Sequence, residues 1–125
     1  MKHLVRLSIL FTLLANAMSA QAEPAYRHVV LFRFKDDAPA AKVVEIEKAF
    51  MALKGKISLI QEVEWGLNVS PEGLNDGYTH CFLVTFKQKA DLERYLPHPA
   101  HRAFVDILKP QLDKVLVVDY LAQKK

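Results

Sequence analysis

The sequence predicts an α+β fold of the ferredoxin-like, split βαβ class, in which helices cover one face of a four-stranded antiparallel sheet. Two observations lead to this prediction. Segments with the alternating pattern of strands and segments with the apolar spacing of helices follow one another in the order β-α-β-β-α-β. The predicted strands are also apolar on the face that the helices leave bare. We therefore expect two copies of the chain to pack sheet against sheet as a homodimer.

The first half of the domain reads as a strand followed by an amphipathic helix. Residues 27–34 alternate, with His28 and Val30 on one face and Val29 and Leu31 on the other. The segment Asp36-Asp37-Ala38-Pro39 then supplies a helix start, and we expect Gly55 to end the helix. The apolar residues at helical spacing are Val43, Ile46, Ala49, Phe50 and Leu53.

The second half begins with two more strands, over residues 62–68 and 78–86, joined by a loop rich in turn residues. A short helix over residues 90–95 is interrupted at Pro97-His98-Pro99, and a second helical stripe follows from Ala100 to Leu112. The remaining elements are a closing strand over residues 115–121 and a tail over residues 122–125.

The N-terminus has the three regions of a secretory signal peptide. Basic residues precede an apolar run that is too short to span a bilayer, and Ala20-Gln21-Ala22 suits signal peptidase. We expect cleavage after Ala22, which leaves residues 23–125 as one domain that is periplasmic or secreted. No cysteine follows the apolar run, which argues against a lipid anchor, and no later segment is apolar enough to be transmembrane.

Charge and cysteine content exclude several classes of function. The signal segment contains Lys2 and Arg6 but no acidic residue, so its removal lowers the formal charge from +3 to +1. A nearly neutral domain without a basic cluster is not expected to bind nucleic acid or anionic lipid. Cys81 is the only cysteine, so no intramolecular disulfide forms, and its strand pattern predicts a buried, unreactive thiol.

The stretch from Tyr95 to His101 is the strongest candidate for a functional site. Proline favours the first position of a helix, so we expect Pro99 to open a helix with His101 in its first turn. The positive end of the helix dipole disfavours a protonated imidazole, which would keep His101 neutral and able to act as a base. The alternative interpretation is structural: His98 caps the helix, and Tyr95 and His101 pack at its edge.

Several motifs together resemble the stress-responsive α/β-barrel family, also called Dabb domains. They are Tyr26 to Phe32, Trp65-Gly66, Gly77-Tyr78-Thr79-His80, Val84-Thr85-Phe86, Tyr95 to His101 and Asp119-Tyr120. The most specific is His-Pro-Ala-His after a tyrosine, preceded by Gly-Tyr-Thr-His at a strand end. The resemblance implies a dimeric α+β barrel built from two ferredoxin-like subunits.

The resemblance also implies roles for particular residues. In plant polyketide cyclases of this family a Tyr/His pair performs the proton chemistry, and the matching residues here are Tyr95 and His101. Phe50 stands where the cyclases have a pocket tyrosine, so a polar contact is lost and the polyketide substrate does not carry over. We expect an apolar cavity between strands and helices whose ligand-binding residues are His28, Val30, Phe50, His80, Phe82, His98 and Phe104.

Two functions remain open at this point. The chain is either a dimer that binds a small apolar or carbonyl-containing molecule, with a stress-related role, or a cofactor-free cyclase, isomerase or lyase. In the enzyme, His101 would be the base and Tyr95 the donor to the oxyanion. A metal site at His98 and His101, with His28 and His80 nearby, is a weaker alternative, because tetrahedral sites need three or four convergent ligands. We therefore expect neither a metal nor a cofactor.

Overall fold

The structure is a computed structural model that describes residues 24–124, so the predicted signal segment lies outside the described residues. The predicted order β-α-β-β-α-β is confirmed, and the second helix is divided in two. The elements are β1 (Tyr26–Phe34), α1 (Ala40–Lys56), β2 (Glu62–Leu67), β3 (His80–Phe86), α2 (Lys89–Tyr95), α3 (Pro99–Leu108), the 3₁₀ turn η1 (Lys109–Gln111) and β4 (Leu112–Leu121).

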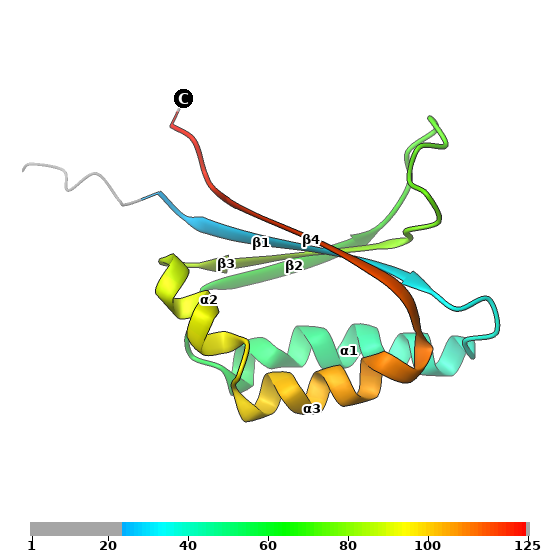
Figure 1. The fold of residues 1–125 in the computed structure, drawn as a ribbon, viewed down its shortest axis with the longest axis horizontal. Helices are drawn as coiled ribbons and strands as arrows, with labels where there is room; N and C mark the ends of the chain where they lie inside the picture. The colour runs from blue at the N-terminus through cyan, green and yellow to red at the C-terminus, as the bar shows by residue number, and fades with distance from the viewer. Residues whose placement is uncertain (1–23, 125) are drawn as a thin grey trace, which may run out of the picture.

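The strands form one antiparallel sheet in the order β2-β3-β1-β4, as the ferredoxin-like topology requires. The helices all lie on one side of this sheet, and the opposite face is bare (Figure 1). Strand β1 is central, and its residue His28 lies opposite Val84 of β3 and Asp119 of β4. No helix within residues 24–124 is long and apolar enough to cross a membrane.

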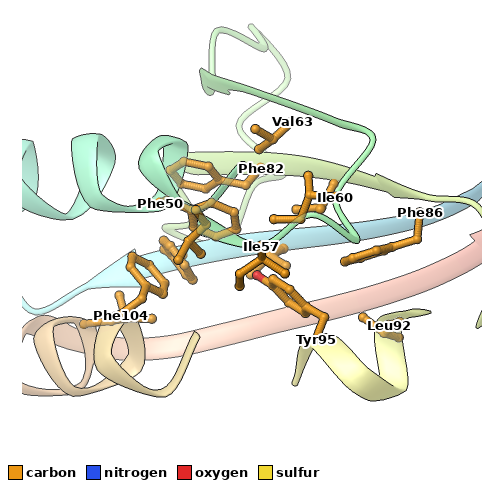
Figure 2. Close-up of a cluster of buried hydrophobic side chains, with 14 of the residues drawn as sticks. Phe50, Ile57, Ile60, Val63, Phe82, Phe86, Leu92, Tyr95 and Phe104 are labelled. Carbon is orange, nitrogen blue, oxygen red and sulfur yellow. The ribbon is translucent and has the colours of Figure 1, made fainter. Parts of the chain in front are cut away.

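The core between the helices and the sheet contains a group of packed aromatic rings (Figure 2). Phe50 of α1 stacks on Phe82 of β3 with ring centroids 4.0 Å apart, and Phe104 of α3 meets the Phe50 ring edge-on at 5.0 Å. These three side chains are at most 4% exposed. Their packing joins both long helices to the middle of the sheet.

The break between α2 and α3 lies at Pro97 and Pro99, as predicted. Pro99 occupies the start of α3, and the imidazole of His98 caps this helix by accepting a hydrogen bond from the Ala100 backbone N–H at 3.0 Å. Several boundaries differ from the predictions. Helix α3 ends at Leu108 instead of reaching Leu112, and Leu112 is already the first residue of β4, which was expected to begin at residue 115. Helix α1 continues past Gly55 to Lys56, and β3 begins at His80, because Gly77 takes a left-handed conformation (φ +75°) in a turn before it.

The bare face of the sheet is apolar, as expected, but it exposes the cysteine. Cys81 alternates with the buried His80 and Phe82, so its thiol points to the bare face and is exposed. The prediction of a buried thiol is therefore wrong for this structure of a single chain. Burial by neighbouring side chains is only partial, and it still raises the pKa of the thiol.

Candidate functional site

A cavity of about 250 Å³ lies between α3 and the strands β1 and β4. Tyr95, at the end of α2, and His101, in the first turn of α3, both line it, together with His28 of β1. Most of the remaining wall is apolar. The full lining comprises His28, Val30, Phe32, Phe50, Tyr95, Leu96, His101, Phe104, Val105, Leu108, Lys109, Leu112, Val115 and Val117.

Tyr95 presents a protonated phenol to this cavity. Its side chain is 1% exposed, and Figure 2 shows its hydroxyl directed inward, towards the middle of the core. Among residues 24–124, no group forms a hydrogen bond with this hydroxyl. Burial raises the pKa of Tyr95 well above its ordinary value, so the phenol keeps its proton. It is therefore suited to donate a hydrogen bond into the cavity.

His101 lies beside this phenol with its tautomer fixed by the backbone. The ring centroids of Tyr95 and His101 are 4.4 Å apart. Nδ1 of His101 lies 2.9 Å from the Leu96 carbonyl oxygen, which only accepts hydrogen bonds, so Nδ1 must carry a proton and donate it. The neutral ring then has its lone pair on Nε2, which is bound to no described residue.

The pKa of His101 is lowered, as the sequence predicted, but for another principal reason. Partial burial of the imidazole lowers the pKa most, the Leu96 carbonyl opposes this, and the neighbouring His28 and His98 lower it further. The helix dipole was the expected cause, whereas desolvation in the cavity wall is the main one. With either cause the imidazole of His101 is neutral at physiological pH and can act as a base.

Asp119 is a site residue that sequence reasoning missed. Its carboxylate lies 2.6 Å from Nδ1 of His28 and accepts a hydrogen bond from the Tyr26 hydroxyl at 3.2 Å. A carboxylate accepts from Nδ1–H, so Nε2 of His28 carries the free lone pair in the neutral ring. The His28 ring meets Tyr95 edge-on at 6.0 Å. The polar end of the cavity thus contains two oriented imidazoles and one phenol.

Three of the predicted ligand-binding residues lie outside this cavity, contrary to expectation. His98 does not line the cavity and caps α3, as the structural alternative proposed. Phe82 is fully buried between the rings of Phe50 and Trp65. His80 lies opposite Phe32, four residues along β3 from the partner of His28, which is about 13 Å along a strand. The remaining predicted residues, His28, Val30, Phe50, Tyr95, His101 and Phe104, do line the cavity.

His80 instead belongs to a closed polar cluster. Its Nε2 lies 2.8 Å from a carboxylate oxygen of Glu47 on α1, and its Nδ1 lies 2.8 Å from the Thr79 hydroxyl. The ring also stacks on Trp65 with centroids 5.7 Å apart. Both ring nitrogens are therefore occupied by protein partners.

The four predicted metal-ligand candidates do not converge. His80 and His98 lie away from the cavity that His28 and His101 share. Within residues 24–124, no group of three or more His, Cys, Asp or Glu side chains is arranged to hold a metal ion.

The comparison with known families agrees with this architecture. The family model for the stress responsive A/B barrel domain (Dabb) matches residues 26–122. The chain belongs to this family. The match spans every strand and helix described above, so the family resemblance inferred from the motifs is confirmed.

Two curated plant relatives share most of this chain. A stress-response A/B barrel domain-containing protein, HS1, of Arabidopsis thaliana is 41% identical over 80% of this chain and 92% of its own length. Olivetolic acid cyclase of Cannabis sativa is 33% identical over 80% of this chain and 99% of its own length.

Solved structures give the same fold. A hydroxynitrile lyase from Passiflora edulis superimposes with a TM-score of 0.77 at 25% identity, over 82% of this chain and 97% of the lyase. A dimeric protein of unknown function with a ferredoxin-like fold, from Bacteroides fragilis, has a TM-score of 0.64 at 31% identity, over 78% of this chain and 95% of its own. Proteins similar to this chain therefore include a cyclase, a lyase and a protein of unknown function.

Proposed function

We propose that the cavity binds a small apolar carbonyl compound and that Tyr95 and His101 transfer a proton on it without a cofactor, as a cyclase, isomerase or lyase would. One observation carries this proposal. A phenol that keeps its proton and an imidazole with a fixed tautomer lie 4.4 Å apart, ring to ring, on the wall of one apolar cavity.

The chemistry follows from the two groups. Nε2 of His101 accepts the proton from the carbon next to the carbonyl. The electron pair of the broken C–H bond forms a carbon–carbon double bond, and the π pair of the carbonyl moves to its oxygen. The Tyr95 hydroxyl donates a hydrogen bond to this developing oxyanion. The apolar wall strengthens both interactions, because charges are poorly screened away from water. His101 then returns its proton to carbon or to a leaving group.

The relatives support this reaction class at a general level. Olivetolic acid cyclase and hydroxynitrile lyase are both enzymes on the same fold. In this chain the wall around the Tyr-His pair is mostly apolar and includes the ring of Phe50. We therefore infer a substrate with a small aromatic or aliphatic body.

Binding without turnover is the second candidate. The cavity wall is mostly apolar, and three of its four polar side chains, His28, Tyr95 and His101, lie at one end. This arrangement suits retention of a small ligand as well as its conversion. In that case the stress-related role would rest on sequestering the ligand. Loss of the Tyr95 hydroxyl would then weaken binding but change no reaction.

We also propose that the protein works as an exported homodimer. Leu31, Leu116 and Val118 lie on the bare face of the sheet, and the last two are about half exposed. The related Bacteroides fragilis protein is described as dimeric. Packing of two such faces would remove this apolar area from water. The signal-like segment over residues 1–22 supports export.

Deuterium exchange tests the catalytic proposal without knowledge of the natural substrate. A small ketone with an aromatic body, such as phenylacetone, is incubated with the protein in heavy water, and loss of its α-proton signals is followed by NMR. We expect the wild-type protein to accelerate exchange. His101→Gln should lower the protein-dependent rate by about a hundredfold, because a general base contributes at least that factor. Tyr95→Phe should lower it through loss of the oxyanion donor.

Two matched variants control for indirect effects. His98→Asn keeps a side chain that caps a helix, and it removes an imidazole that lies outside the cavity. Tyr78→Phe removes a phenol hydroxyl elsewhere on the chain. Both should exchange the ketone at nearly the wild-type rate. An unchanged rate in His101→Gln, or no acceleration by the wild type across a panel of ketones that bind, would leave binding alone as the function.

A further inference from the structure

The cavity has a second polar end that the proton chemistry does not use. His101 lies in the first turn of α3, and Lys109 follows the last residue of this helix. The eight-residue separation corresponds to about 12 Å along a helix axis. Lys109 lines the same cavity as His101, so the two residues mark opposite ends of one elongated space.

The wall between these ends is apolar. Phe104, Val105 and Leu108 come from α3, and Val115 and Val117 come from β4. The two valines are about half exposed, so the cavity is open along this strand. A ligand that reaches from His101 to Lys109 would therefore contact hydrocarbon along its body and polar groups only at its two ends.

Lys109 is the one formally charged residue among the described residues that line the cavity. Its ammonium makes no ion pair or hydrogen bond with any residue in the range 24–124, although other surface lysines do, such as Lys42 with Glu45. Lysine stems commonly cover apolar surface and leave the ammonium free at its edge. An anion at this edge would gain a partner without displacing an existing one.

We propose that Lys109 recognises a carboxylate, so that the ligand is a small keto acid with its carbonyl at the Tyr95 and His101 end and its carboxylate at the Lys109 end. The placement of the carbonyl rests on the proposed function; the placement of the carboxylate rests on Lys109 alone. An apolar segment separates the two groups. Neutral molecules of the same shape bind more weakly.

Calorimetric titration with matched probes tests this assignment. The probes are benzoyl-terminated carboxylates of increasing length (benzoylpropionate, benzoylbutyrate and benzoylvalerate) and the methyl ester of each. For the best-fitting length we expect the acid to bind wild-type protein about three- to fivefold more tightly than its ester, the factor of a partly exposed ion pair. Added salt should reduce this preference.

Substitution of the lysine gives the decisive comparison. Lys109→Met keeps an apolar stem of similar length, and we expect it to bind acid and ester equally. Lys54→Met removes an exposed lysine on α1, away from the cavity, and should keep the wild-type preference. Equal binding of acid and ester by the wild type, a preference that survives in Lys109→Met, or no binding of either probe would each overturn the proposal.

This measurement separates the proposal from the catalytic one. Binding is read directly and does not require turnover. A protein that prefers the acid but exchanges no α-proton would keep the Lys109 assignment and lose the catalytic role. A protein that exchanges ketones but shows no preference would keep the catalytic role and lose the assignment.

Discussion

His80 and His101 lie on the same side of the sheet but have opposite chemical environments. Both ring nitrogens of His80 have protein partners, Glu47 and Thr79, and its ring is covered by Trp65. His101 has one partner, the Leu96 carbonyl, and its second nitrogen is bound to no described residue. A histidine with both nitrogens satisfied stabilises the fold, whereas one with a free lone pair on a cavity wall can react.

The largest effect expected from this contrast is on stability. His80→Ala leaves the largely buried Glu47 carboxylate without its partner, so we expect the free energy of unfolding to fall by about 2 to 3 kcal/mol. His101→Ala removes one hydrogen bond at a half-buried position, and we expect a loss below about 1 kcal/mol. Urea denaturation of the two variants measures both values. Equal losses would contradict the division into structural and reactive histidines.

A smaller effect is expected at the pair that orients the second cavity imidazole. Asp119→Asn keeps the shape of the side chain but removes the charge that accepts from His28 and Tyr26. We expect a loss of about 1 kcal/mol in the free energy of unfolding, because hydrogen bonds to a charged acceptor are stronger than neutral ones. Urea denaturation detects it, and Asp113→Asn, at an exposed ion pair with Arg33, is the control. A loss no larger than in this control would show that the carboxylate does not hold His28.

The smallest effect concerns pH. Since burial puts the pKa of folded His101 below the ordinary 6.5, the unfolded chain binds the proton first as the pH falls. The stability linked to His101 is therefore complete above about pH 6.5 and declines as the pH falls towards the folded pKa. Catalysed exchange should fall over the same range, because the base becomes protonated.

An NMR titration of the His101 ring, compared with His98→Asn, checks the direction and one cause of this shift. Removal of the neighbouring imidazole should raise the pKa of His101 slightly. A His101 pKa at or above that of an unfolded histidine would contradict the argument from burial.

Much of this site was predictable from the sequence because its features are local. The two prolines fix the chain between Tyr95 and His101, so the proximity of these two side chains follows from seven residues of sequence. Their position in one cavity with His28, Val30, Phe50 and Phe104 was expected from the family resemblance together with the strand faces that point to the helices. The expectation about His80 was wrong, because face alternation says on which side a residue lies but not how far along the strand.

The sequence by itself determined the element order, the two apolar faces of the sheet, the divided helix and the family, since each depends on periodicity or on short motifs. Only the tertiary structure decided which polar groups meet. The pairing of His28 with Asp119 spans 91 residues and depends on the register between β1 and β4. The exposure of Cys81 and the place of Lys109 at the far end of the cavity likewise depend on which strand and helix lie side by side. Such contacts are set by long-range packing, which local sequence patterns do not encode.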